Sequence, residues 1–229
     1  MNLDAVTVGR FRHFHDLYLQ TRDIEGDIVE CGVGPGRSLA MLALALKLEG
    51  ETRKRIWAFD SFEGLPDPTP EDASVRNPKR GQLMYRLDSV RELIQETVRD
   101  PQFVSSRVQF IKGFFQDTLD VMQTRRIALL HLDVDLYASY KSCLDSLYQR
   151  VTPGGIITFD EYVRGQIKFP GGVRAIVEFF KDRGLEFERD HYTSNYFVRV
   201  PATEYDGPKP ASEITRKPLA RAGAVETPA

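Results

Sequence analysis

Short apolar runs alternate along this chain with longer segments whose apolar residues recur at helical spacing. Five runs predict strands that alternate with helices, and the stretch before residue 200 predicts an antiparallel strand pair. The expected strands are 27–31, 54–60, 107–113, 127–133, 156–162, 185–191 and 195–200, and the expected helices are 38–50, 87–98, 140–151 and 172–184. Strands that alternate with helices form a mostly parallel sheet covered on both faces. The pattern therefore predicts an α/β fold with a seven-stranded, mostly parallel sheet.

Two segments interrupt this pattern. Residues 61–83 are rich in proline and charge and predict a long surface loop. From residue 205 onward the chain again contains prolines but shows no apolar periodicity, so we expect 205–229 to be a disordered tail. A chain of 229 residues suits one large domain, which we place at 1–204.

Composition narrows the class of protein. Apolar residues make up 41% of the chain and the net charge is −2, which is typical of a globular domain and gives no reason to expect nucleic acid as a partner. The longest apolar run, 39–46, is too short to cross a bilayer, and the N-terminus shows no signal peptide. Cys31 and Cys143 cannot form a disulfide framework or a cysteine zinc site. We therefore expect a cytoplasmic protein without a membrane partner.

Acidic side chains follow four of the predicted strands. Glu30, Asp60, Asp133 and Asp160 each lie at the carboxyl end of a strand. The carboxyl ends of parallel strands meet at one edge of the sheet, where ligands bind in such folds. A buried carboxylate is costly unless it is paired or bound to a metal. Four carboxylates on one edge therefore favour a site over the simpler reading that strands end where polar residues begin.

A glycine-rich loop joins the first expected strand to the first expected helix. Gly32, Gly34 and Gly36 permit unusual backbone angles and the close approach of a ligand. Arg37 stands where a dinucleotide-binding fingerprint needs its third glycine, and the Gly-Lys-Ser/Thr of a P-loop is missing. Asp60 could accept hydrogen bonds from two ribose hydroxyls. An adenosine with a short charged tail satisfies both features, and S-adenosylmethionine is such a molecule.

Four stretches together carry a family resemblance: "VECGVGPGRSLAML", "FDSFEGLPDPTP", "LLHLDVDLYASYKSCLDSLYQRVTPGGIITFDEY" and "GGVRAIVEFF". Across 25–200 the chain resembles the macrocin-type (TylF-like) sugar O-methyltransferases of natural-product biosynthesis. The resemblance implies a class I methyltransferase fold, S-adenosylmethionine as cofactor, and a divalent cation, usually Mg²⁺. It also implies methylation of a hydroxyl of a sugar or similar diol in a natural product or glycan. The expected partner is then a small-molecule or glycoside acceptor.

The resemblance also assigns roles to individual residues. Asp133, Asp160 and Glu161 match the metal ligands, although the last of these is commonly an aspartate in the family. Asp133 also matches the general base that removes the proton of the acceptor. The cofactor-binding residues implied at the matching positions are Glu30, Gly32, Gly34, Ser38, Asp60, Ser61 and Gly113.

Several alternatives stay open. Asp135 either binds the metal or only caps the following helix, and His131 fits a core histidine better than a catalytic one. Methylation of a catechol or phenol is a second function, but Leu136 stands where catechol-type relatives have a lysine. A non-catalytic protein that binds S-adenosylmethionine is a third. The lid over the acceptor would come from residues 1–22, from a mobile 62–86 loop, or from another subunit of a homo-oligomer.

Overall fold

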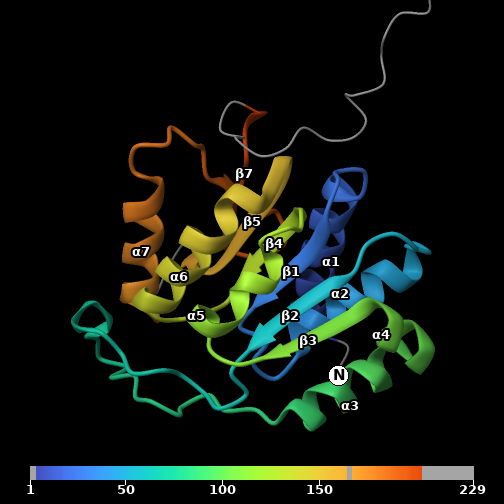
Figure 1. Cartoon of the computed structure of the whole chain (residues 1–229), viewed down its shortest axis with the longest axis horizontal. Coiled ribbons are helices and arrows are strands. Elements are labelled where there is room, and N and C mark those ends of the chain that lie inside the picture. The colour runs from blue at the N-terminus through green and yellow to red at the C-terminus, as the bar shows by residue number, and fades with distance from the viewer. Residues whose placement is uncertain (1–3, 164–166, 203–229) are drawn as a thin grey trace, which may run out of the picture.

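Seven strands form one sheet at the centre of the described chain (Figure 1). The computed structural model describes residues 4–163 and 167–202, and the expected tail at 205–229 lies outside them. The strands are β1 (Asp27–Cys31), β2 (Ile56–Asp60), β3 (Val108–Lys112), β4 (Ile127–Leu132), β5 (Val151–Val163), β6 (Glu188–Arg189) and β7 (Asn195–Arg199). Their order is β3-β2-β1-β4-β5-β7-β6, with β1 to β5 parallel and β7 antiparallel to its neighbours. This arrangement confirms the predicted α/β fold with a seven-stranded, mostly parallel sheet.

Helices cover both faces of the sheet (Figure 1). The α-helices are α1 (Ala5–Thr21), α2 (Arg37–Leu48), α3 (Leu87–Val98), α4 (Pro101–Arg107), α5 (Phe115–Thr118), α6 (Tyr137–Leu147) and α7 (Pro170–Phe180), and the short 3₁₀ turns are η1 (Pro70–Asp72), η2 (Leu119–Met122) and η3 (Tyr148–Arg150). α1 to α4 pack on one face, and α5 to α7 pack on the other. Each layer buries its own apolar core against the sheet, which stabilises the fold through the hydrophobic effect.

The apolar pattern explains most of these elements. Every side chain of β4 is buried, as expected for a central strand covered by helices on both faces. α3 buries Val90, Ile94 and Val98, which recur at helical spacing along one side. α1 is harder to predict, because its buried Phe14 and Leu17 are interspersed with polar and charged residues. The apolar side of this helix is recognisable only from its packing against α2 and the sheet.

Two segments differ from the expected strands. Residues 152–155, which lie between the expected helix 140–151 and the expected strand 156–162, belong to β5. The left-handed φ of 84° at Gly154 bends the strand, and hydrogen bonds between Gly154 and Val200 at 2.8 Å and between Val200 and Gly155 at 2.9 Å keep it paired. The strand expected at 185–191 is reduced to the two residues of β6.

The proline-rich loop between β2 and α3 leaves the edge of the sheet, runs toward α7 and returns (Figure 1). The N–H of Leu65 donates to the carbonyl of Gln82 at 2.8 Å, and the N–H of Gly81 donates to the carbonyl of Leu65 at 2.9 Å. η1 lies within the loop and packs against α7. The segment is therefore the predicted loop, and its two ends are tied together at the base.

The carboxyl ends of β1, β2, β4 and β5 meet at one edge of the sheet. The N–H of Gly32 donates to the carbonyl of Phe59, and the N–H of Asp133 donates to the carbonyl of Cys31, both at 2.9 Å. Gly32 has a φ of 82°, and a Cβ built there would lie 1.8 Å from the carbonyl oxygen of Asp133. Only glycine therefore allows the loop after β1 to pass this close to the end of β4.

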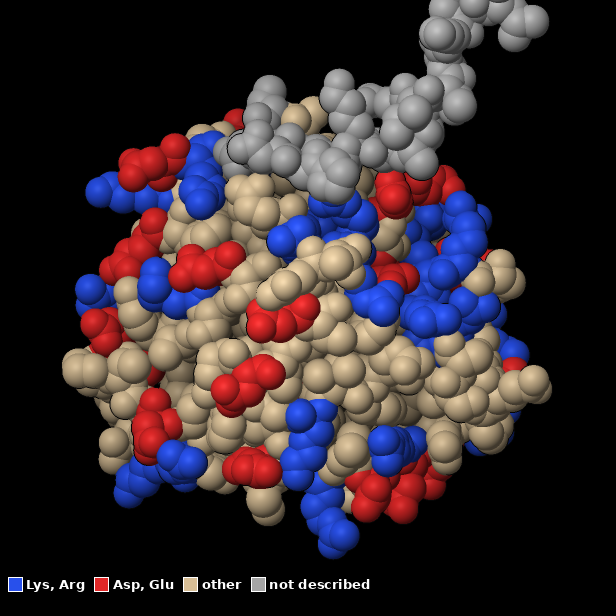
Figure 2. All heavy atoms as spheres, viewed as in Figure 1, with Lys and Arg blue, Asp and Glu red and all other residues tan. Residues whose placement is uncertain are grey.

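Positive and negative side chains are interspersed over the face drawn in Figure 2. No helix in the described part of the chain combines the length and the apolar character needed to span a bilayer. The expectations about nucleic acid and cellular location rest on composition and stay predictions.

Candidate active site

A cavity of about 350 Å³ opens where the strands of the sheet end. Its lining includes the predicted residues Gly32, Gly34, Asp60, Ser61, Gly113, Asp133, Asp160 and Glu161. A smaller cavity of about 130 Å³ adjoins it, since Asp133 and Asp160 line both, and Ser38 lies in its wall. Glu30 is completely buried beside Ser38. The structure thus brings the predicted cofactor residues and the predicted metal residues to one place.

Asp60 holds the glycine loop in position. Its Oδ2 accepts hydrogen bonds from the N–H groups of Val33 at 2.9 Å and Gly34 at 3.0 Å, and its Oδ1 accepts one from the N–H of Phe62 at 2.7 Å. A carboxylate offers about four lone-pair positions, so Oδ1 retains one for a ligand. In this conformation the side chain keeps an acceptor position open toward a ribose hydroxyl, and its predicted contact with the ribose stays a prediction.

Ser61 and Gly113 shape the backbone on the same side of the cavity. The Oγ of Ser61 donates to the carbonyl of Gly64 at 2.9 Å and accepts from the N–H of Glu63 at 3.0 Å. The N–H of Gly113 donates to the carbonyl of Asp60 at 3.0 Å. This wall is therefore built largely from backbone groups that local hydrogen bonds hold in place.

Glu30 is completely buried at the end of β1. Its Oε1 accepts a hydrogen bond from the Oγ of Ser38 and lies 3.1 Å from the Nδ1 of His131. Its Oε2 has no hydrogen-bond partner among the described residues, although an unpaired carboxylate oxygen is costly in the interior. His131 also packs edge-on against Phe14. It is thus a partnered interior residue, which is the reading that the sequence favoured.

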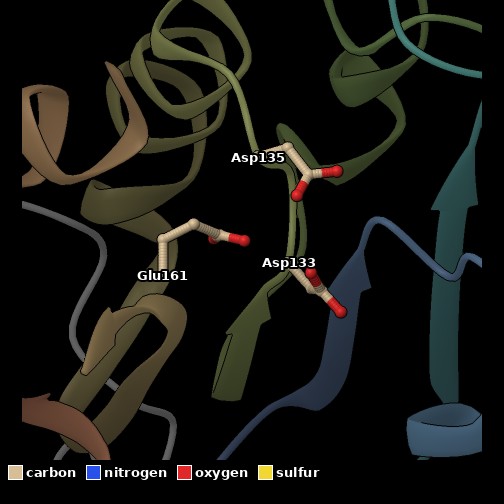
Figure 3. A group of neighbouring side chains, drawn as sticks. All are labelled: Asp133, Asp135 and Glu161. Carbon is tan, nitrogen blue, oxygen red and sulfur yellow. The ribbon is translucent and has the colours of Figure 1, made fainter. Parts of the chain in front are cut away.

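Three carboxylates lie close together where β4 and β5 end (Figure 3). Asp133 and Asp135 lie on the turn that follows β4, and Glu161 extends from β5 toward that turn. One oxygen from each of the three side chains lies within 4.8 Å of the others. Divalent cations such as Mg²⁺ and Ca²⁺ prefer oxygen ligands of this kind.

These carboxylates hinder one another's ionisation. Loss of solvation raises the pKa of Asp133 and that of Glu161 well above their usual ranges, and repulsion from neighbouring carboxylates raises them further. Loss of solvation also raises the pKa of Asp135 to about 7, although a hydrogen bond with Glu161 and the charge of Arg76 act in the opposite direction. A cation bound among these groups would favour their charged forms.

A strained turn directs Asp135 into this group. Asp135 has a φ of 57°, in the left-handed region that aspartate tolerates better than most residues. The N–H of Leu136 donates to the carbonyl of Val134 at 2.5 Å, which closes a three-residue turn around Asp135. In a regular strand Asp133 and Asp135 would simply share a face. The sequence alone therefore could not show how Asp135 lies relative to the other carboxylates.

The predicted ligand Asp160 lines both cavities but lies outside that close group of three. The Nδ2 of Asn195 donates to the carbonyl of Phe159 at 3.0 Å and to the Oδ1 of Asp160 at 3.3 Å. The guanidinium of Arg10 lies 3.9 Å from the same Oδ1. The predicted metal set stays a prediction, and the geometry adds Asp135 as a fourth candidate.

Residues 5–192 match the family model of the macrocin O-methyltransferases (TylF). This match covers most of the chain. The chain belongs to the TylF family. The resemblance inferred from the sequence motifs is thereby confirmed.

Two curated proteins are similar to this chain over part of their length. The chain is 35% identical over 144 residues to the 8-demethyl-8-(2,3-dimethoxy-α-L-rhamnosyl)-tetracenomycin-C 4′-O-methyltransferase of Streptomyces olivaceus, covering 61% of this chain and 54% of that protein. It is 32% identical over 145 residues to the demethyldecarbamoylnovobiocin O-methyltransferase of Streptomyces niveus, covering 62% of this chain and 54% of that protein. The chain thus spans about half the length of these relatives.

Solved structures agree on the fold. The calicheamicin methyltransferase CalS11 superposes with a TM-score of 0.72 at 25% identity, over 82% of this chain and 77% of that one. The O-methyltransferase NovP superposes with a TM-score of 0.70 at 24% identity, over 85% of this chain and 80% of that one. The TylF-family chain therefore has the predicted class I methyltransferase fold.

Sequence reasoning missed three residues of this TylF-family site. Arg10 reaches both cavities from α1, and Asn195 holds the carboxylate of Asp160 from β7. Tyr140 of α6 hydrogen-bonds to the Oε2 of Glu161, and burial together with that carboxylate raises the pKa of the tyrosine well above its usual range. The sequence carries no signal for Arg10 or Asn195. For Tyr140, the sequence indicated only that it lies in an expected helix, 140–151.

Proposed function

We propose that this chain is an S-adenosylmethionine-dependent O-methyltransferase that methylates a hydroxyl of a sugar or similar diol in a natural product or glycan. We also propose that a divalent cation binds at its acidic cluster, and that Mg²⁺ is the preferred cation. One observation carries the proposal: a glycine loop held by Asp60 and a cluster of carboxylates face the same cavity. The names of the relatives support it, because two are O-methyltransferases of a rhamnosyl-tetracenomycin and of demethyldecarbamoylnovobiocin.

The smaller cavity suits the amino-acid end of the methyl donor. Arg37 lies in its wall with Ser38, where α2 begins without a side-chain cap, so positive charge and free N–H groups are available for a carboxylate. Asp133 in the same wall provides negative charge for an ammonium group. Asp60 retains one acceptor position for a ribose hydroxyl. The residues present therefore fit S-adenosylmethionine.

The acidic cluster fits a divalent cation. It presents carboxylate oxygens, and burial together with repulsion between these groups raises the pKa values of Asp133 and Glu161, so a bound cation would favour their charged forms. Asp133, Asp160 and Glu161 would hold the ion, with Asp135 near enough to join or replace one of them. A cation bound there would lower the pKa of the acceptor hydroxyl and orient it.

The chain's own carboxylates can remove the proton from the acceptor. A sugar hydroxyl is a poor nucleophile near neutral pH, so a base must accept its proton as the methyl group is transferred. We assign this role to a carboxylate oxygen of Asp133, which lies between the two cavities. Asp135 is the competing candidate. The remaining wall residues exclude water and hold the donor and acceptor in line.

Part of the wall of the larger cavity suits a ring with apolar faces. Leu65 and Phe169 lie in its wall, and the guanidinium of Arg76 stacks over the ring of Phe169 at 4.4 Å. Leu136 is completely buried in a cluster with Leu65 and Phe169. The position where catechol-type relatives have a lysine is therefore part of the apolar packing here. This observation favours a sugar or other diol over a catechol.

Methyl transfer from labelled S-adenosylmethionine tests the proposal directly. With Mg²⁺ present, we expect label in sugar acceptors such as rhamnosides and none in catechol. Asp133→Asn should abolish transfer, whereas Asp145→Asn on the exposed side of α6 should leave it unchanged. Transfer to catechol alone, or the absence of S-adenosylhomocysteine binding in calorimetry, would contradict the proposal.

A further inference from the structure

The loop between β2 and α3 carries a buried carboxylate that the proposed mechanism does not use. Asp72 is 3% exposed and ends η1. Its Oδ1 accepts a hydrogen bond from the N–H of Tyr137 at 2.8 Å. Its Oδ2 accepts from the N–H of Thr69 at 2.8 Å and from the hydroxyl of Thr69 at 3.0 Å. Both oxygens are therefore committed, one to the loop itself and one to a distant helix.

Asp72 stands at the N-termini of two helices. Tyr137 is the first residue of α6, and Leu136 before it provides no side-chain cap, so Asp72 supplies the missing acceptor from a segment 65 residues away. α7 also begins without a side-chain cap. A Cβ built on Gly171, in its first turn, would lie 1.9 Å from the Oδ1 of Asp72. The negative charge thus lies close to the positive ends of both helix dipoles.

The acidic cluster has two halves: Asp133 and Asp135 on the turn after β4, and Glu161 on β5. Each half is followed along the chain by one of these two helices. α6 begins two residues after Asp135, and α7 is the helix that follows the β5 carboxylate Glu161. α7 also contacts the turn that carries Asp135: a Cβ built on Gly172 would lie 2.6 Å from the carbonyl oxygen of Asp135 and 2.9 Å from the ring of Tyr140. Glycine at this position therefore lets α7 pack directly against the acidic turn.

We infer that Asp72 is a positioning residue that fixes the starts of α6 and α7 and so holds the two halves of the acidic cluster at the spacing that binds one cation. The inference rests on the proposed function for the cation, but its structural part does not. It also assigns a role to the middle of the loop. That part of the loop is a fixed support of the site, and it cannot move away without releasing the N-terminus of α6.

A plain stabilising role is the alternative, and the chain offers a matched control. Glu51 is also buried and also accepts backbone N–H groups, from Arg53 at 2.6 Å and Lys54 at 3.3 Å. It lies before β2, at the opposite edge of the sheet from the site. Loss of either carboxylate should lower the melting temperature, but only loss of Asp72 should change the acidic cluster.

Calorimetry with Mg²⁺ alone separates the two roles. We expect Asp72→Ala to weaken Mg²⁺ binding about tenfold, as removal of an outer-shell support commonly does, and to leave the affinity for S-adenosylhomocysteine unchanged. Asp72→Asn keeps an acceptor oxygen for Tyr137 and should recover most of the Mg²⁺ affinity. Glu51→Ala should bind Mg²⁺ like the unmodified protein. Normal Mg²⁺ binding by Asp72→Ala, or an equal loss in Glu51→Ala, overturns the inference.

Hydrogen exchange makes the test independent of the metal. If the unmodified protein binds no Mg²⁺, the cation in the proposed function is wrong, yet the coupling through Asp72 can still be measured. Asp72→Ala should increase amide exchange across 133–140, and Glu51→Ala should not. Gly171→Ala should be strongly destabilising in the unmodified protein but much less so in the Asp72→Ala background, since the atom that it meets is gone. Unchanged exchange together with additive effects on stability would refute the coupling.

Discussion

Buried carboxylates at the two edges of the sheet have pKa values shifted in opposite directions. At the amino ends of the strands, burial alone would raise the pKa of Glu51, but hydrogen bonds from the N–H of Arg53, from the hydroxyl of Tyr18 and from Lys54 lower it to about 2. At the carboxyl ends, burial and mutual repulsion raise the pKa of Asp133 well above its usual range. Glu51 is therefore stabilised in its charged form, whereas the environment of Asp133 favours the neutral, protonated form.

The difference shows how a site can be distinguished from a structural carboxylate. A carboxylate that serves stability is surrounded by donors, as Glu51 is, and its ionisation favours folding. A carboxylate in a ligand-binding site lacks those donors, and its charge tends to destabilise the folded protein when no ligand is bound. Changes that remove charge should therefore have opposite effects at the two edges.

The largest effect is expected for turnover when a predicted metal ligand is removed. Asp160→Asn should lower kcat by about 10²–10³-fold, the usual cost of losing one group that stabilises charge in the transition state. Affinity for S-adenosylhomocysteine, measured by calorimetry, should hardly change, because the cation contacts the acceptor rather than the adenosine. EDTA should have the same effect on the unmodified protein, reversibly on adding Mg²⁺. Full methyl transfer by a demonstrably metal-free protein would remove the cation from the mechanism.

The next effect concerns Asp60, which lies at the site edge but has its charge satisfied by the glycine loop. Asp60→Ala should weaken binding of S-adenosylhomocysteine by about 1.5–3 kcal/mol, the range for hydrogen bonds to a charged group, because it loses a ribose acceptor and frees the N–H groups of Val33 and Gly34. Calorimetry checks this value, with Glu51→Ala as the control. Unchanged affinity in Asp60→Ala would contradict the assignment of Asp60 to the donor.

The sequence was most informative about residues that lie at the carboxyl ends of strands. In a parallel sheet, the ends of consecutive strands meet at one edge whatever the detailed packing. Hence Asp60, Asp133, Asp160 and Glu161 could be placed together from strand patterns and motifs alone, and all four line one cavity. The fold was predictable for the same reason, since alternating strands and helices leave few arrangements.

The sequence could not show features that depend on contacts between distant segments or on single backbone angles. Nothing in the pattern links Asp72 with the N-terminus of α6, because the two meet only after the loop has folded back. The left-handed φ of Asp135 decides that it joins Glu161, and no spacing rule gives that angle. Likewise, Asn195 meets Asp160 only because β7 pairs antiparallel with β5, and no pattern in the sequence gives the register of that pairing.

At the edge formed by the amino ends of the strands, Glu51→Gln should reduce the free energy of unfolding by about 2 kcal/mol at neutral pH. The reason is that hydrogen bonds to a charged acceptor are replaced by weaker ones. The folded-state pKa of about 2 lies below the usual glutamate value of 4.5, so this contribution is present above pH 4.5 and is lost as the pH falls toward 2. Urea unfolding across that range should therefore show a flatter pH dependence for Glu51→Gln. An unchanged slope would mean that Glu51 is not satisfied as the structure indicates.

At the site edge the sign should reverse, with the smallest effect of the series. Asp135 has its pKa raised from 3.8 to about 7, so the folded protein holds a proton there that the unfolded chain releases, and stability falls as the pH rises through that range.

Asp135→Asn removes the charge and keeps a residue type that tolerates the φ of 57°. In EDTA it should raise the free energy of unfolding by about 1 kcal/mol at about pH 8, and by much less at about pH 5. Asp145→Asn, on the exposed side of α6, should show no such pH dependence. A loss of stability in Asp135→Asn at the higher pH would mean that the carboxylates at this edge are satisfied after all, and the contrast between the two edges would fail.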